Sequence, residues 1–93
     1  MIPMINTKKL VHLYLRYYFM AHLSGNKMMS DKILYDTLME WFDNDKNKVN
    51  CFINTQFNRI GYEMSIGKHD DLVKELTPVV LNEIRQQMKQ LNK

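Results

Sequence analysis

The stretch TKKLVHLYLRYYFMAHL, Thr7 to Leu23, decides the fold because its apolar residues recur with the period of an α-helix. Asn6 or Thr7 can cap the first turn, and residues 24–26, SGN, are suited to a left-handed C-terminal turn. The apolar arc of this helix is about twice as wide as its polar arc, which is more than a surface helix needs. Such a helix is central in its own domain or is covered by another chain.

A narrow polar stripe, with Lys8, Lys9, His12 and Arg16, runs along one side of this helix. The far side is apolar and aromatic, with Leu10, Leu13, Tyr14, Tyr17, Tyr18 and Ala21. A small core cannot satisfy the hydroxyl groups of all three tyrosines. We therefore expect Tyr14, Tyr17 and Tyr18 to contact solvent or a partner protein.

A second helix is predicted from about Asp31 to Phe42, with Ser30 as its cap. The polar, turn-rich loop 43–48, DNDKNK, is expected to end it. Its core face is expected to hold Ile33, Leu34, Leu38, Trp41 and Phe42.

The span 49–64 has apolar residues at helical intervals, and we predict a helix over most of it. In the alternative, 49–53 is an extended stub and the helix begins at Asn54 or Thr55, either of which is a good cap. Gly61 is either a weak point of this helix or a site of close packing.

The last helical segment begins at Asp70, after a connector at 65–69, and contains Pro78. Proline ends or kinks a helix, and Thr77 before it is a suitable cap for a new one, so four or five helices are predicted. A short apolar stripe follows, consisting of Leu81, Ile84, Met88 and Leu91. This stripe either packs on its own core or contacts another protein. The fold class is all-α, in a single domain over residues 1–93.

Composition narrows the class of protein. The 93 residues are 45% hydrophobic and 25% charged, as in a globular domain, and include eight methionines, which suit adaptable binding surfaces. A single cysteine, Cys51, indicates a reducing, cytoplasmic compartment, and we interpret it as a small, partly buried hydrophobic residue. The apolar run 10–23 contains charged and histidine residues and is too short to span a bilayer, so we expect no membrane anchor.

Catalysis is the least favoured function. The sequence has no glycine-rich phosphate loop and no paired carboxylates in an evident pocket. His12, His22 and His69 have no metal-ligand spacing with one another or with the cysteine. We therefore expect neither a metal, nor a cofactor, nor an enzymatic activity.

The net charge is +3, and the charged residues are unevenly distributed along the sequence. Residues 1–29 and 46–68 are basic, whereas 30–45 are acidic. The two basic blocks either share one face that contacts a polyanion, or they are solvated and contribute little.

The helix Asn54–Met64 has the composition of a nucleic-acid reading helix. Its core side is expected to hold Phe57, Ile60 and Met64, and its other side carries asparagine, arginine, threonine and tyrosine, which pair with bases or phosphates. The predicted nucleic-acid contacts are Lys8, Lys9, Arg16, Lys46, Lys48, Thr55, Asn58, Arg59 and Tyr62. DNA is thus one expected partner.

The segment SDKILYDTLMEWFDNDKNKVNCFINTQFNRIG, Ser30 to Gly61, resembles the winged-helix segment near the C-terminus of phage, plasmid and poxvirus-type primase-helicases. The matching positions are Leu34, Tyr35, Trp41, Phe57 and Arg59. The resemblance implies a DNA-contacting role for the third helix, with Thr55, Asn58 and Arg59 as contacts. The chain departs from the family pattern in its long connection between the helices and in the connector 65–69, which is too short for a two-stranded wing.

The two candidate functions are therefore both forms of binding. The first is a small, non-catalytic nucleic-acid-binding regulator or accessory factor. The alternative is a protein-interaction module or small inhibitor, which would bind or self-associate through aromatic and methionine-rich surface. The residues predicted for that interface are Tyr14, Tyr17, Tyr18, Leu81, Ile84, Met88 and Leu91.

Overall fold

The computed structural model describes residues 5–91, which are all helical apart from short connections. Four helical rods follow one another along the chain, and the described residues contain no strand. They are α1 (Thr7–Ser24), α2 (Lys27–Trp41), the continuous rod of α3 (Lys46–Phe52), η1 (Ile53–Phe57) and α4 (Asn58–Ser65), and α5 (Asp70–Leu91). The predicted all-α class is confirmed. We call the third of these the α3–α4 rod.

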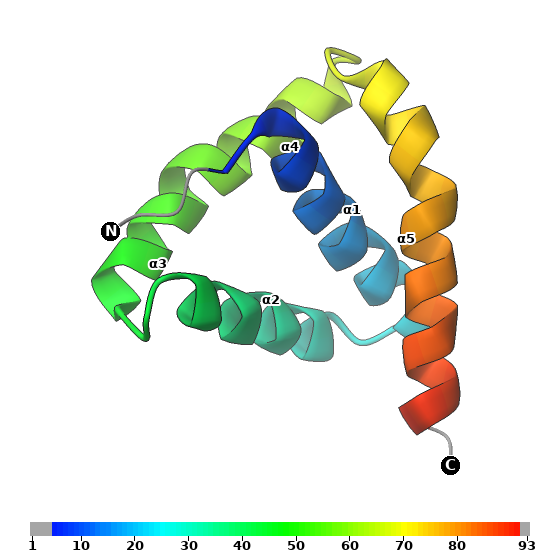
Figure 1. The fold of residues 1–93 in the computed structure, drawn as a ribbon, viewed down its shortest axis with the longest axis horizontal. Helices are drawn as coiled ribbons and strands as arrows, with labels where there is room; N and C mark the ends of the chain where they lie inside the picture. Colours follow the sequence, from blue (N-terminus) through cyan, green and yellow to red (C-terminus); the bar gives the residue numbers. More distant parts are fainter. Residues whose placement is uncertain (1–4, 92–93) are drawn as a thin grey trace.

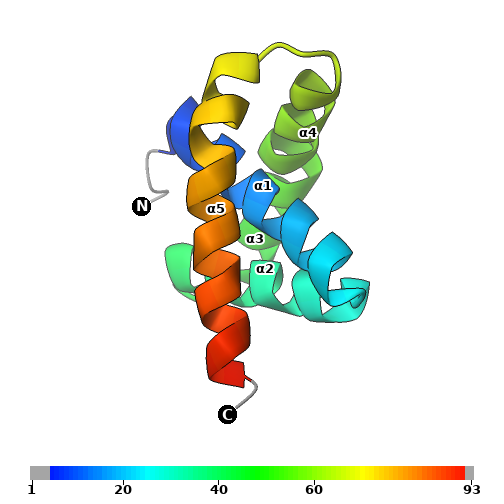
Figure 2. The same cartoon turned by 90° about the vertical axis from the view of Figure 1, so that its right-hand side faces the viewer.

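Helix α1 is the centre of the molecule. Asn6 caps it by accepting a hydrogen bond from the Lys9 amide at 2.8 Å, and Gly25 ends it in the left-handed conformation with φ 66°. Figure 1 shows the other three rods arranged as a triangle around α1, and each of them contacts it. Figure 2 shows α5 running across α1 at a steep angle. Most of the wide apolar arc of α1 is therefore covered by its own domain, although Tyr18 is 46% exposed.

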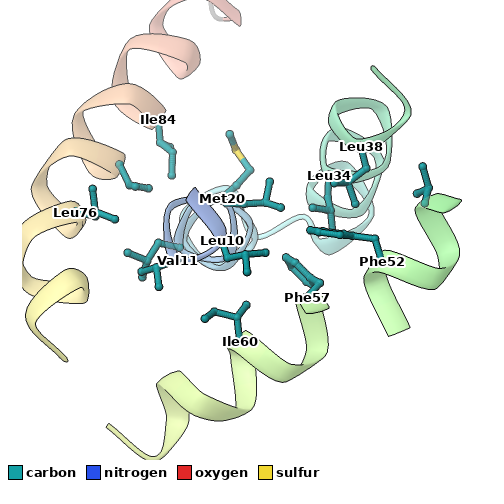
Figure 3. Close-up of a cluster of buried hydrophobic side chains, with 14 of the residues drawn as sticks. Leu10, Val11, Met20, Leu34, Leu38, Phe52, Phe57, Ile60, Leu76 and Ile84 are labelled. Carbon is teal, nitrogen blue, oxygen red and sulfur yellow. The ribbon is translucent and has the colours of Figure 1, made fainter. Parts of the chain in front are cut away.

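One cluster of buried side chains fills the space around α1 (Figure 3). Leu10, Val11 and Met20 of α1 are at most 3% exposed, although they point in different directions from the helix. Every other rod adds buried side chains, namely Leu34 and Leu38 from α2, Phe52, Phe57 and Ile60 from the α3–α4 rod, and Leu76, Val80 and Ile84 from α5. A core shared in this way couples all four rods.

The α3–α4 rod is helical throughout, so the alternative of an extended stub at 49–53 is wrong. Asp45 caps the rod by accepting from the Lys48 amide at 3.2 Å. Helix α3 thus begins inside the predicted loop, and Lys46 and Lys48 lie in its first turn. The segment Ile53–Phe57 is a π-helical turn. Phe52 and Phe57 are five residues apart, and the π-turn allows both to face the core.

Gly61 is a site of close packing, which was one of the two predicted roles. A Cβ atom at Gly61 would lie 2.6 Å from Cε2 of Tyr14. The Tyr14 ring in turn lies against Phe57, with ring centroids 5.0 Å apart. The absence of a side chain at Gly61 therefore allows the α3–α4 rod to lie against α1 at this point.

The predicted start of the second helix is wrong. Helix α2 begins at Lys27, one turn earlier than expected, because Asn26 caps it by accepting from the Met29 amide at 3.0 Å. Ser30 is not a cap; it is buried, and its hydroxyl donates to the Tyr17 carbonyl at 2.7 Å. This hydrogen bond joins α2 to α1.

The predicted break at Pro78 is also wrong, because α5 continues through it. Thr77 is not a cap, since its hydroxyl donates to the Val73 carbonyl at 2.6 Å within the helix. An internal proline loses one backbone hydrogen bond and strains the preceding turn. Leu76 and Val80 on either side of it are buried against α1, and this packing offsets the cost of the proline.

Candidate nucleic-acid interface

The outer face of the α3–α4 rod is the strongest candidate site. No acidic residue occurs between Lys46 and Tyr62, a span that contains three cationic side chains, Lys46, Lys48 and Arg59. The six contacts predicted in this region are all exposed, namely Lys46, Lys48, Thr55, Asn58, Arg59 and Tyr62. The structure therefore exposes all six along one rod. We call this surface the outer face.

Local contacts leave these side chains accessible. Arg59 is 61% exposed, and its Nε lies 4.0 Å from a Glu63 oxygen. Lys48 has a similarly long separation of 4.0 Å from Asp45. Exposed ion pairs at such distances are typically worth under about 1 kcal/mol. A phosphate group can therefore replace these partners at little cost.

Glu63 borders the outer face and links the rod to the connector that follows it. Its Oε1 lies 2.7 Å from His69 Nε2, and its Oε2 lies 3.5 Å from Lys68 Nζ. The hydrogen bond with His69 lowers the pKa of Glu63; partial desolvation opposes this change, and Lys68 and Arg59 add to the lowering. The carboxylate stays ionised and is surrounded by basic groups, which limits its repulsion of an anion.

Three further amides lie on the same surface and were not predicted. Asn47, Asn50 and Asn54 are exposed on the rod, upstream of Asn58. Their recurrence every three or four residues is the sequence signal for this row. The prediction places Asn47 in the loop 43–48 and gives Asn54 the role of a possible cap, so neither is predicted as a contact. Cys51 is also exposed here, so its interpretation as a partly buried hydrophobic residue is wrong.

The cations of α1 do not join the outer face. Lys8 Nζ lies 3.5 Å from Glu75 of α5, and Arg16 donates to Gln87 of α5 at 3.3 Å. Lys9 lies over the ring of Trp41 in α2, 4.6 Å from its centroid. These three side chains are thus directed towards α5 and α2, whereas α1 packs on the α3–α4 rod through Tyr14 and its neighbours.

The residues predicted for a protein interface are divided between core and surface. Ile84 is fully buried and contributes to the protein's own core, so its assignment to an interface is wrong. Tyr14 and Tyr17 are partly buried and both pack on Phe57, whereas Tyr18 is 46% exposed. Leu81 and Met88 are partly exposed, and the side chain of Leu91 lies outside the described part of the structure.

Comparison with known proteins gives no relative: no protein-family model, no curated protein and no solved structure matches this chain. The wing of a winged-helix domain is a pair of strands, and residues 5–91 contain none. The resemblance of Ser30–Gly61 to primase-helicases therefore remains a hypothesis, which rests on the spacing of apolar residues in this segment. Among the described helices, none has the length and hydropathy needed to cross a membrane.

Proposed function

We propose that this protein binds nucleic acid without catalysis, through the outer face of the α3–α4 rod. The observation that carries the proposal is the combination of three cations, exposed amides and an exposed tyrosine on one rigid rod, with no carboxylate between Lys46 and Tyr62. The role is that of a small regulator or accessory factor. DNA binding through Thr55, Asn58 and Arg59 is also what the primase-helicase resemblance implies.

Each type of side chain has a distinct part in this proposal. Lys46, Lys48 and Arg59 neutralise phosphates, and the asparagine amides donate to phosphate oxygens or pair with base edges. Tyr62 is 66% exposed, and its ring offers a surface on which an unpaired base can stack. Because the outer face runs along one continuous helical rod, it can follow either the groove of a duplex or the backbone of a single strand.

The number of cations sets the expected salt dependence. Each neutralised phosphate contributes about −0.9 to the slope of log K against log salt for duplex DNA, so three contacts give a slope of about −2.7. A slope of this size corresponds to modest affinity that is lost at high salt. The cations of α1 are excluded from this count because they are directed towards α5 and α2.

Fluorescence anisotropy with labelled duplex and single-stranded DNA, across a salt series, tests the proposal. Arg59→Ala should make the salt slope shallower by about one unit. Tyr62→Ala should weaken binding to a single strand more than to a duplex, because base stacking is lost. Arg85→Ala is the matched control, since Arg85 is an exposed arginine on α5. Equal slopes for wild type and Arg59→Ala, or no binding at low salt, would refute the proposal.

The alternative function, protein interaction or self-association, is favoured by a different part of the surface. Tyr18, Leu23 and Met28 lie near the turn between α1 and α2 and are 46%, 50% and 82% exposed. Three large apolar side chains so close in sequence are typical of a contact surface. Sedimentation velocity of wild type and Met28→Ser distinguishes the cases: a concentration-dependent dimer that the substitution dissociates would favour self-association.

A further inference from the structure

A cavity between α1 and α2 is separate from the outer face of the α3–α4 rod. It has a volume of about 270 Å³ and is lined mainly by side chains from these two helices. Its apolar surface comes from Leu13 and Met20 of α1 and from Ile33 and Leu34 of α2. Lys9 and Arg16 also line it, as does Trp41, the single tryptophan of the chain. The cavity thus combines apolar walls with cationic groups.

The charges around the cavity are not balanced by carboxylates in its wall. None of its lining residues is acidic. Within residues 5–91, the hydrogen bond of Arg16 goes to a neutral amide oxygen, that of Gln87, at 3.3 Å, and Lys9 lies over the Trp41 ring. Two acidic groups outside the wall contact lining residues: Asp31 accepts a hydrogen bond from the Tyr17 hydroxyl at 2.6 Å, and Glu83 of α5 lies 3.2 Å from His12.

Arg16, which lines the cavity, has one donor without a partner among the described residues. The Nε atom of Arg16 is buried and makes no hydrogen bond with any described residue. Buried donors are almost always paired, and an unpaired donor on a charged group is especially costly. An anionic ligand in the cavity would be attracted by the Arg16 guanidinium and by Lys9, both of which line it.

We propose that this cavity binds a small carboxylate with an apolar tail. The carboxylate accepts hydrogen bonds from Arg16, and the tail lies between α1 and α2 against Leu13, Met20 and Ile33. Ligand pockets usually measure about 300 Å³ or more, so a cavity of this size accepts only a small ligand. A short fatty acid has both the charge and the shape that the wall requires. This site is independent of the proposed nucleic-acid binding.

Octanoate is a suitable probe, and 1-octanol is its uncharged counterpart. Titration of the 93-residue protein with octanoate should give a saturable change in Trp41 fluorescence and a shift of the Met20 methyl resonance, because both groups line the cavity. Binding of 1-octanol should be about tenfold weaker or more, since it lacks the charge-assisted hydrogen bond. Arg16→Gln should weaken octanoate binding by a similar factor, whereas Arg85→Gln should leave it unchanged.

Two results would overturn the proposal. The first is the absence of both the fluorescence and the methyl signal at millimolar octanoate. The second is equal affinity for octanoate and 1-octanol in the wild type, which would make the cavity a purely apolar site. The second comparison needs no variant, so it remains decisive if Arg16→Gln does not fold.

Discussion

At the scale of single residues, Gly61 is a position where a methyl group, added by substitution with alanine, would collide with the Tyr14 side chain. Alanine normally stabilises a helix interior relative to glycine by about 1 kcal/mol. Here the added Cβ would lie 2.6 Å from the Tyr14 ring, which is held against Phe57. We predict that Gly61→Ala lowers the free energy of unfolding by about 1–3 kcal/mol, as overpacking does. Urea denaturation measures this loss.

A double-mutant cycle with Tyr14→Ala separates overpacking from any other cause. With the ring removed, Gly61→Ala should stabilise the protein by about 0.5–1 kcal/mol, because only the helix propensity remains. A stabilising effect of Gly61→Ala in the wild-type protein would contradict the predicted collision.

The ionisation of Tyr17 is linked to folding. Burial, together with the hydrogen bond of 2.6 Å to Asp31 and the charges of Asp31 and Tyr14, raises the pKa of Tyr17 from 10.0 to about 12. The folded state therefore holds this proton more tightly than the unfolded state does. Its contribution to stability is complete below pH 10 and is lost as the pH rises through about 12.

We predict that one of the five tyrosines ionises late in an absorbance titration at alkaline pH. Asp31→Asn should lower the pKa of Tyr17 but should not restore its ordinary value, because burial, the largest cause, remains. Circular dichroism at each pH is the control for unfolding. Simultaneous ionisation of all five tyrosines in the folded protein would be inconsistent with the Asp31 contact.

At the scale of elements, the π-turn in the α3–α4 rod sets which side of the rod faces α1. Phe52 and Phe57 are separated by five residues, whereas a regular α-helix aligns residues three or four apart. Deleting the exposed Asn54 would leave a separation of four, which a regular helix accommodates. We predict that this deletion preserves cooperative folding and costs less than about 2 kcal/mol.

Insertion of one alanine after Asn54 is the matched control. A separation of six residues turns Phe57 away from the core, and loss of a buried phenylalanine costs about 3–5 kcal/mol. Denaturant unfolding of the two variants gives the comparison. Equal losses would show that the π-turn has no part in aligning the two rings.

The sequence predicted the bounds of a helix correctly where its capping and turn residues agreed with the tertiary packing of that helix. Asn6 and Gly25 bound α1 as expected, because caps and left-handed turns depend on nearby residues. The predicted break at Pro78 was wrong because the tertiary packing of α5 outweighs the local tendency of proline to end a helix. The exposed side of the α3–α4 rod followed from its apolar positions. The surroundings of Lys9 and Arg16 could not be predicted, since they depend on how α2 and α5 dock on α1.

At the scale of the whole molecule, the central position of α1 implies cooperative unfolding. Its side chains fill one core with residues from every other rod, so no rod can leave without exposing α1. Trp41, at the end of α2, reports on the α1–α2 contact through Lys9, whereas far-ultraviolet circular dichroism reports on all the helices. The two signals should follow the same denaturation curve.

Ile84→Ala tests this coupling most directly, because Ile84 belongs to α5 and is fully buried, whereas Trp41 belongs to α2. The substitution should destabilise the protein by about 2–5 kcal/mol, as is usual for a buried isoleucine. If the core is one unit, the fluorescence transition of Trp41 moves by the same amount as the circular dichroism transition. Leu38→Ala in α2 should move both transitions in the same way. A fluorescence transition that stays in place in Ile84→Ala would show that α1 and α2 fold without α5, and the single shared core would be wrong.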